Sequence, residues 1–305
     1  MANSNERSAR LLIFGCGYVG TALARRARER GWRVVALTRN PARGEELRGC
    51  GVEVVAADLA ESGWHDQVSR DQNYVVNCVS SGGGGLPGYW RSYVDGTRSI
   101  LQWAGMELPA TYVYTSSTSV YGQGGGETVT EESPTGGGSE ASEPLIVTEN
   151  LVRESRAFRR AFVLRLAGIY GPGRHYLLDQ LRAGATLFPG TGAHRLNLVH
   201  RDDIVSAILA CLDAPASIVG GVFNVADDAP APKAEVAAWL AERIGVPAPQ
   251  FAQDLPATSR PEVSPVRGRS GPVPDRYISN ARLKDVLGWA PRYPDFRAGY
   301  QAILA

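Results

Sequence analysis

Three glycines near the start of the chain have the spacing of a phosphate-binding turn. Gly15, Gly17 and Gly20 form the pattern G-x-G-x-x-G after the apolar run 11–14, and residues 21–30 have helical character. The first glycine permits a tight turn, the second lets the backbone approach a diphosphate, and the third lets helix and strand pack closely. The helix that follows directs free N–H groups and a partial positive charge at the phosphates. The predicted dinucleotide site comprises Gly15, Cys16, Gly17, Tyr18, Val19 and Gly20.

The residues after the second predicted strand indicate which dinucleotide binds. A carboxylate about 20 residues past the glycines would bind the ribose 2′-hydroxyl of NAD, but the chain has Arg39 in that region. A guanidinium suits the 2′-phosphate of NADP through bidentate, charge-assisted hydrogen bonds, and Arg43 could assist. The sequence therefore favours NADP as the cofactor. NAD is the alternative, with Arg39 solvated or stacked on the adenine ring.

Polar residues after the third and fourth predicted strands extend this site. Asp58, followed by Leu59, could accept a hydrogen bond from the adenine amino group or could cap a helix. Ligands of a parallel sheet bind at the carboxyl edge of its strands. We therefore expect Val79 and Ser80 to contact the cofactor and Ser81 to contact the substrate.

The elements that would position these residues alternate between strand and helix. Near-continuous apolar strands separated by helices, one of them over 89–103, imply a parallel sheet covered on both faces. The prediction is an α/β protein with a doubly wound, parallel-sheet Rossmann fold and a small, mostly C-terminal substrate lobe. The expected strands cover residues 11–14, 32–38, 52–57, 74–79, 111–115 and 162–169.

The same pattern suggests where the domains divide. We expect residues 1–171 to form the NAD(P)-binding domain, with 194–226 contributing strands and a helix to it. Residues 172–193 and 227–305 are expected to form the substrate-side lobe. Two segments look like long surface loops, because they are rich in residues such as Gly, Ser and Pro. They are 122–142 and 256–274.

The composition argues against several classes of function. The 305 residues carry a formal net charge of +1, so no global field directs the chain to nucleic acid or to an anionic membrane. The four cysteines lack C-x-x-C spacing, which argues against a zinc site or a disulfide framework and fits a reducing cytoplasm. Residues 1–10 lack an apolar signal core, and no apolar run reaches the roughly 18 residues that a membrane span needs. We expect a cytoplasmic protein with a small-molecule substrate and no bound metal.

Several motifs in a fixed order carry a family resemblance. Besides the glycine turn and Asp58, they are TSSTSVYG at 115–122, LRLAGIYGPG at 164–173 and NLVHRDD at 197–203. The chain resembles the extended short-chain dehydrogenase/reductase superfamily, specifically the NAD-dependent epimerase/dehydratase family. It is most similar to an atypical, YeeZ-like branch that shares the GPGRH run at 171–175. The resemblance implies an oxidoreductase or epimerase that acts on a small polar molecule such as a nucleotide sugar. It also implies that the protein can form a homodimer.

The resemblance also implies a catalytic Ser, Tyr and Lys, of which only the serine is present. Ser117 matches the family serine, which orients the substrate oxygen. The Tyr and Lys belong to a Y-x-x-x-K helix, in which Tyr transfers a proton and Lys lowers the Tyr pKa. No tyrosine lies between Tyr121 and Tyr170, and no lysine precedes Lys233. The alignment instead places Ser142 at the Tyr position and an isoleucine, Ile146, at the Lys position.

Other residues are candidates to replace the lost groups. Tyr121 could donate a proton, although its V-Y-G turn is mainly structural in the family. Glu143 and Glu149 could act as acids, but we favour a solvated helix face for them. Arg174 could clamp an anionic substrate, and His175 could titrate near neutral pH.

Three functions remain open from the sequence. The first is an NAD(P)-dependent enzyme with unusual or reduced chemistry. The second is a catalytically reduced NADP(H) sensor or regulatory protein. The third is a lyase or isomerase that uses Arg174 and His175 without hydride transfer. The V-H-x-D-D element, with His200 and Asp203, favours a capping or packing role over catalysis.

Overall fold

The chain forms two compact units in the computed structural model, which describes residues 8–81, 83–253 and 274–305. Unit 1 comprises Met1–Ser116, Glu143–Leu164 and Ala207–Val222, and unit 2 comprises Ser117–Ser142, Arg165–Ser206 and Phe223–Ala305. These units differ from the domains expected from the sequence. Residues 117–142 and 165–171 group with unit 2, whereas the expected boundaries place them in the Rossmann domain.

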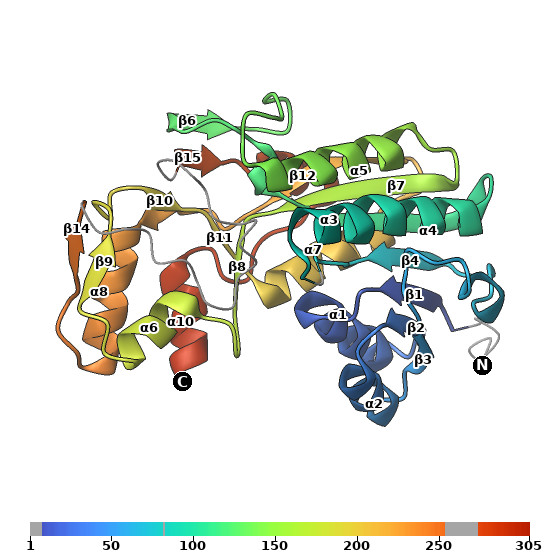
Figure 1. Cartoon of the computed structure of the whole chain (residues 1–305), viewed down its shortest axis with the longest axis horizontal. Coiled ribbons are helices and arrows are strands. Elements are labelled where there is room, and N and C mark those ends of the chain that lie inside the picture. The colour runs from blue at the N-terminus through green and yellow to red at the C-terminus, as the bar shows by residue number, and fades with distance from the viewer. Residues whose placement is uncertain (1–7, 82, 254–273) are drawn as a thin grey trace, which may run out of the picture. The chain divides into compact units, whose positions relative to one another are not determined.

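A seven-stranded sheet forms the frame of unit 1, in the order β12-β7-β5-β4-β1-β2-β3 (Figure 1). β1 pairs in parallel with both β2 and β4, so the strand order reverses direction between β1 and β4. This reversal is the topological switch point at which doubly wound sheets bind ligands. The predicted Rossmann fold is confirmed. The strands are β1 (Arg10–Phe14), β2 (Arg33–Thr38), β3 (Glu53–Ala56), β4 (Tyr74–Asn77), β5 (Leu108–Ser117), β7 (Phe158–Leu166) and β12 (Gly220–Val225).

Helices lie on both sides of this sheet (Figure 1). The central strand explains why both faces must be covered, because residues Leu11–Phe14 of β1 have no exposed surface. α1 meets the sheet through Leu23, Ala24 and Ala27, and its arginines remain on the outer face. The helices that belong wholly or partly to unit 1 are α1 (Tyr18–Glu29), α2 (Pro41–Gly49), η1 (His65–Gln67), α3 (Gly85–Tyr89), η2 (Trp90–Asp95), α4 (Gly96–Ala104), α5 (Glu143–Glu154) and α7 (Arg201–Asp213).

The helix after β4 is not a regular α-helix along its whole length. The sequence predicts one helix over 89–103, and the structure has α3 and α4 joined through a π-helical segment, η2. A π-helical segment widens a helix locally and is common at functional sites. Arg91 lies on this segment.

Unit 2 is built on short paired strands and a helical core. α6, α8 and α10 pack together through buried residues that include Leu178, Leu240 and Phe296. β8 pairs with β11, β9 with β14, β10 with β13, and β6 with β15. The elements are η3 (Thr118–Val120), β6 (Gly125–Val129), η4 (Glu140–Ser142), β8 (Gly168–Tyr170), α6 (Tyr176–Arg182), β9 (Leu187–Pro189), β10 (Arg195–Leu196), β11 (Leu198–His200), β13 (Ala231–Pro232), α8 (Lys233–Ile244), β14 (Gln250–Ala252), β15 (Asp275–Ile278), α9 (Ala281–Leu287) and α10 (Phe296–Leu304).

One of the two expected surface loops contains regular structure. Segment 122–142 includes β6, which pairs in parallel with β15 far along the chain. The sequence could not show this pairing, because the partner strand lies more than 100 residues away and β6 itself is mostly exposed. Of the second expected loop, 256–274, all but Pro274 lies outside the described residues.

Candidate functional site

The turn between β1 and α1 needs glycine at two positions. Gly15 has a φ of +80°, and a Cβ there would lie 2.6 Å from the backbone of Val79 after β4. A Cβ on Gly20 would lie 2.5 Å from the carbonyl oxygen of Gly15. Real Cβ atoms do not come so close to backbone, so a side chain at either position would push the turn away from the sheet.

Gly17 differs from these two, because no atom lies within 4 Å of the place where its Cβ would stand. It is the N-cap of the twelve-residue helix α1, which has no side-chain cap and no acidic residue in its first turn. The first-turn N–H groups of a helix bind anions when no side chain satisfies them. These residues therefore fit a dinucleotide diphosphate, with Gly17 leaving room for it.

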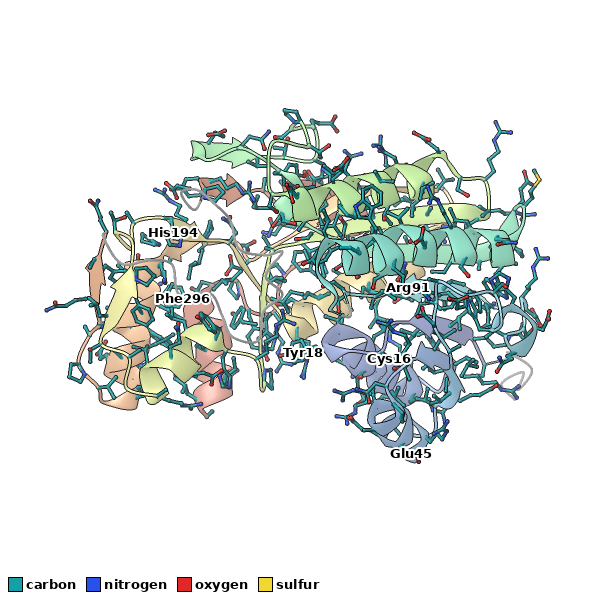
Figure 2. All side chains as sticks on the ribbon, in the orientation of Figure 1. Cys16, Tyr18, Glu45, Arg91, His194 and Phe296 are labelled. Atoms are coloured by element: carbon teal, nitrogen blue, oxygen red, sulfur yellow. The ribbon has the colours of Figure 1, made fainter. Side chains whose placement is uncertain are left out.

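The other residues of the turn serve mainly to hold it. Cys16 is buried, and burial raises the pKa of its thiol above the ordinary range, so only its backbone can face a ligand. The Cys16 carbonyl accepts a hydrogen bond from Thr21 Oγ1 at 3.0 Å. Val19 is buried and Tyr18 is partly exposed at the start of α1, where Figure 2 labels it together with Cys16.

The residues after β4 are held against this turn. Asn77 Oδ1 accepts a hydrogen bond from the Val79 N–H at 3.1 Å, and the buried Asn77 amide also donates to Thr97 and Tyr112. Ser80 is exposed and Ser81 is half-buried. Val79 therefore borders the glycine turn, and the two serines follow it at the carboxyl edge of the sheet.

Charged residues gather beyond β2 and β3. Arg39, with 49% of its side chain exposed, lies with Nη1 3.4 Å from Asp58 Oδ2. Asp58 Oδ1 accepts the Ala60 N–H at 3.0 Å, so Asp58 stabilises the turn in which it lies. Asp58 does not cap a helix, because the next helix begins at His65. Burial alone would raise the pKa of Asp58, but the Ala60 N–H, Arg91 and Arg39 together hold it below its ordinary value. Leu59, the next residue, is buried.

Arg91 belongs to the same cluster and was not predicted from the sequence. Its Nη2 lies 3.2 Å from Asp58 Oδ2 and 2.5 Å from Glu61 Oε1. Nothing in the spacing of the chain connects Arg91 with Arg39, because their proximity depends on how η2 packs beside the ends of the strands. Arg43, expected to assist Arg39, is instead paired with Glu46.

The predicted catalytic groups Ser117, Tyr121 and Ser142 all lie in unit 2. Ser117 is half-buried, and its Oγ accepts the Ser119 N–H at 3.1 Å. In the part of the chain that the structure describes, the Ser117 hydroxyl donates no hydrogen bond. Ser142 is buried, and its hydroxyl donates to the Ser139 carbonyl at 2.5 Å.

Tyr121 has no exposed surface and a fully used hydroxyl. Its hydroxyl donates to Asn224 Oδ1 at 2.8 Å and accepts from Arg165 Nη1 at 2.7 Å. Burial raises the pKa of Tyr121, although Arg165 opposes the rise. Arg276 also donates to the Tyr121 carbonyl, at 2.7 Å. These hydrogen bonds suit a residue that holds the loop after Ser117 in place.

Arg174 and His175 lie together on a tight turn of unit 2. Backbone hydrogen bonds of 3.0 Å join Gly171 and Arg174 in both directions, and Arg174 is exposed. His175 Nδ1 lies 2.7 Å from Asp179 Oδ1 on the first turn of α6. The Asp179 carboxylate therefore lies beside one ring nitrogen of the half-buried imidazole.

Glu149 departs from the expected solvated helix face. Only 2% of the residue is exposed, and Oε1 accepts the Ser116 hydroxyl at 2.5 Å. The sequence did contain a signal, because Glu149 follows Leu145 by four residues and precedes Val152 by three on the buried face of α5. Glu143, at the start of the same helix, is exposed as expected.

His200 and Asp203 are both buried in unit 2. Asp203 accepts the backbone N–H groups of Arg292 and Tyr293 at 2.7 and 3.1 Å. The His200 ring packs on Tyr170 and Tyr293, and burial lowers the His200 pKa to about 4. Asp203 therefore anchors the C-terminal segment, and His200 packs neutral beside it.

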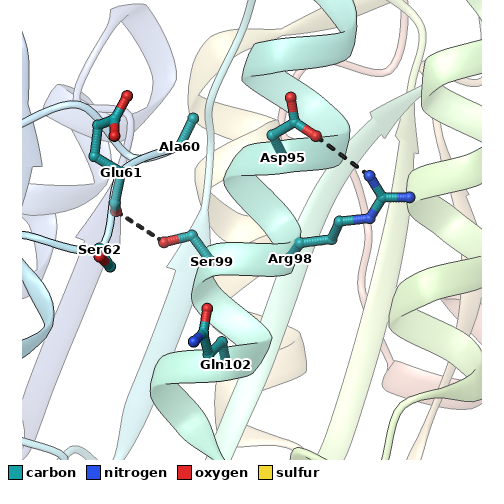
Figure 3. A pocket seen from close by; sticks show the side chains of 7 residues that line it. All are labelled: Ala60, Glu61, Ser62, Asp95, Arg98, Ser99 and Gln102. Carbon is teal, nitrogen blue, oxygen red and sulfur yellow. Dashed lines mark hydrogen bonds and ion pairs between the residues drawn. The ribbon is translucent and has the colours of Figure 1, made fainter.

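A pocket of about 390 Å³ opens in unit 1 beside α4 (Figure 3). Three of its polar side chains are already paired, since Ser99 Oγ donates to the Glu61 carbonyl at 3.0 Å and Arg98 lies 3.3 Å from Asp95. None of the predicted site residues lines it. Among the described residues, no three His, Cys, Asp or Glu side chains gather to hold a metal ion. No helix in the described ranges is long and apolar enough to cross a bilayer.

With the fold and the glycine turn established, comparison with known proteins places the chain in a family. Residues 11–226, more than half of the chain, match the NAD dependent epimerase/dehydratase family. The chain belongs to this family. Protein YeeZ of Escherichia coli (strain K12) is 27% identical over 291 residues, which cover 94% of this chain and 97% of YeeZ. The YeeZ-like resemblance is thereby confirmed.

Solved structures agree with this assignment. A functionally unknown conserved protein from Silicibacter pomeroyi DSS matches with a TM-score of 0.76 and 28% identity, over 97% of this chain and 98% of that one. UDP-glucuronic acid 4-epimerase from Bacillus cereus, solved with UDP-glucuronic acid and NAD, matches with a TM-score of 0.79 and 17% identity. That match covers 97% of this chain and 98% of the epimerase, and at such identity it shows the fold alone.

Proposed function

We propose that this protein is an NADP(H)-dependent oxidoreductase or epimerase that acts on a small polar substrate without the Tyr and Lys of its family. The observation that carries the proposal is the open position of Gly17 at the uncapped start of α1. A diphosphate fits there, and the family is described as NAD dependent. In this proposal the cofactor contacts are made by Gly15 to Gly20, Asp58, Leu59, Val79 and Ser80.

The preference for NADP(H) follows from the charge beyond β2. Arg39 is half exposed, and the next residue, Asn40, accepts the Arg43 N–H to cap α2, so neither residue directly after β2 offers a carboxylate to a ribose hydroxyl. A guanidinium can meet a 2′-phosphate with two parallel hydrogen bonds. Asp58, which already binds Arg39, provides the acceptor for the adenine amino group.

The chemistry in this proposal divides among residues of unit 2. Bound nicotinamide would give or take the hydride. Ser117 donates its unused hydroxyl proton in a hydrogen bond to the substrate oxygen that changes charge. His175, whose ring lies beside the Asp179 carboxylate, takes the proton-transfer role left by the absent tyrosine, because neither Tyr121 nor Ser142 has a free hydroxyl proton.

The proposed substrate carries an anionic group, as a nucleotide sugar does. The exposed Arg174, on a turn fixed by paired backbone bonds, suits such a group. Ser81 is placed at the carboxyl edge of the sheet, where substrate contacts are expected. The Bacillus cereus epimerase of the same fold was solved with UDP-glucuronic acid.

The first test is a tryptophan-fluorescence titration with NADPH and NADH in parallel, on protein freed of co-purified nucleotide. Micromolar or tighter binding of NADPH, and weaker binding of NADH, is the expected result. A panel of nucleotide sugars and small carbonyl compounds then follows. NADPH consumption is the readout for a reductase, and analysis of the sugar product with NADP⁺ is the readout for an epimerase, which consumes no net cofactor. Ser117→Ala should lower kcat/KM by about 100-fold and leave NADPH affinity unchanged, since the lost hydrogen bond acts on the reacting oxygen. If neither dinucleotide binds, the proposed function is wrong.

A second candidate is an NADP(H) sensor, favoured by the engaged hydroxyls of Tyr121 and Ser142 and by Ile146 at the lysine position. A sensor would bind NADPH and change conformation without consuming it. Single-turnover experiments with each compound of the panel separate the two, because an enzyme converts at least one compound and a sensor that binds NADPH converts none.

A further inference from the structure

Two guanidinium groups of unit 1 meet at one carboxylate oxygen. Arg39 Nη1 lies 3.4 Å from Asp58 Oδ2, and Arg91 Nη2 lies 3.2 Å from the same atom. The three residues come from separate segments, after β2, after β3 and on η2. Two guanidinium groups around one anionic oxygen are an arrangement that also binds phosphate oxygens. The Asp58 oxygen therefore occupies a position that suits an external anion.

We propose that Arg91 is a second determinant of cofactor choice, which binds the ribose 2′-phosphate of NADP(H) together with Arg39 when the phosphate replaces the Asp58 carboxylate between them. This inference rests on the proposed NADP(H) site. It names a residue that neither the glycine motif nor the charge beyond β2 identifies.

The exchange is compatible with the contacts of Asp58. Asp58 Oδ1 accepts the Ala60 N–H at 3.0 Å, so the carboxylate remains held when Oδ2 is released. A phosphate dianion carries more charge than a carboxylate and attracts both guanidinium groups more strongly. Arg91 is 48% exposed, and its five donors leave N–H groups for the phosphate while Nη2 stays 2.5 Å from Glu61 Oε1.

The position of the cluster agrees with the adenosine end of the cofactor. The Gly15 N–H donates to the Leu37 carbonyl at 3.2 Å, which joins the glycine turn to the end of β2 just before Arg39. β2 and β3 pair in parallel up to Thr38 and Ala56, so the segments with Arg39 and Asp58 leave the same sheet edge side by side. Other nearby arginines are engaged elsewhere, since Arg25 and Arg43 both pair with Glu46.

The test uses two nucleotide fragments that differ only in the 2′-phosphate. Calorimetric titration of the full chain with 2′,5′-ADP and with 5′-AMP compares wild type, Arg91→Gln, Arg91→Lys and Arg98→Gln. Arg98 is the matched control, because it is an exposed arginine on the neighbouring helix that pairs with Asp95 (Figure 3).

We expect wild type to bind 2′,5′-ADP at least tenfold more tightly than 5′-AMP. Arg91→Gln should weaken the binding of 2′,5′-ADP about tenfold, which corresponds to the loss of one charge-assisted contact. The affinity for 5′-AMP should stay within about twofold of the wild-type value. Arg91→Lys should lie between Arg91→Gln and wild type, and Arg98→Gln should match wild type.

The other outcomes separate this inference from the proposed function. An Arg91→Gln protein with the wild-type ratio of the two affinities overturns the role of Arg91 and leaves the cofactor site standing. Equal weakening of both fragments also overturns it, because Arg91 would then act on the adenosine and not on the phosphate. Wild type that binds both fragments equally overturns the role of Arg91 and the preference for NADP(H). Wild type that binds neither overturns the proposed function itself.

Discussion

In the proposed cofactor site, the residue beyond β2 is the one that selects between the ribose 2′-hydroxyl of NAD and the 2′-phosphate of NADP. In this proposal Arg39 stands where a carboxylate would accept hydrogen bonds from a 2′-hydroxyl, and among the described residues its charge partner is Asp58 at 3.4 Å. A side chain this exposed can be exchanged without disturbing the core. Its substitution therefore tests binding and not folding.

Arg39→Asp is expected to reverse the cofactor preference. NADPH should bind roughly 10- to 100-fold more weakly, because one charge-assisted contact is lost and a like charge faces the phosphate. NADH should bind as well as before or better, since the new carboxylate can accept from the ribose hydroxyls. Parallel fluorescence titrations measure both affinities. Unchanged relative affinities would mean that Arg39 does not contact the ribose.

At the scale of elements, the β1–α1 turn contains two kinds of glycine. Some are needed for the turn to fold, and one leaves space for a ligand. A Cβ at Gly15 meets the backbone at 2.6 Å under a φ of +80°, whereas a Cβ at Gly17 meets nothing within 4 Å. Gly17 has a φ of −80° and a ψ of −142°, so its φ lies outside the left-handed region that favours glycine. The two positions thus form a matched pair for substitution.

Gly15→Ala and Gly17→Ala should have opposite profiles. Gly15→Ala should lower the free energy of unfolding by about 2 kcal/mol or more, through strain and displacement of the turn. Gly17→Ala should change the free energy of unfolding by less than about 1 kcal/mol. It should weaken NADPH binding at least tenfold, because the methyl group fills the place of the diphosphate. Chemical denaturation and NADPH titration of both variants measure this. A Gly17→Ala protein that binds NADPH normally would place the diphosphate elsewhere.

At the scale of the whole molecule, stability depends on pH through a buried carboxyl group of unit 2. Asp227 is 3% exposed and lies near Asp228, Asp295 and Asp203. Burial, and then these carboxylates, raise the pKa of Asp227 to about 8, and the Ala229 N–H opposes them only in part. The folded protein therefore keeps a proton that the unfolded chain releases near pH 4.

The sign of the effect follows from proton binding. Between about pH 4 and about pH 8 the folded state holds more protons than the unfolded state, so stability falls as pH rises through this range. Asp227→Asn cannot ionise and should gain stability over wild type on the order of 1 kcal/mol per pH unit across it. Thermal unfolding of both proteins at pH 5 and pH 8 measures the difference. Asp71→Asn, at an exposed carboxylate, is the control, and an equal effect of both substitutions would contradict the assignment.

The sequence alone determined the features that depend on neighbouring residues. The glycine pattern, the apolar strand at 11–14 and the helix after it specify the β1–α1 turn, because turn sterics and strand burial act over a few residues. The absence of a Y-x-x-x-K pair is likewise a property of the sequence, and it leaves Ser117 and His175 as candidates for the catalytic roles.

The tertiary structure decided which distant side chains meet. Arg91 reaches Asp58 because η2 packs near the end of β3, Glu149 is buried because α5 turns it toward Ser116, and Tyr121 is enclosed by Arg165 and Asn224. The physical reason is that burial and ion pairing depend on the packing of segments tens of residues apart. Local spacing limits which side chains can share a face, but only the packed fold brings charges from distant segments within hydrogen-bonding distance.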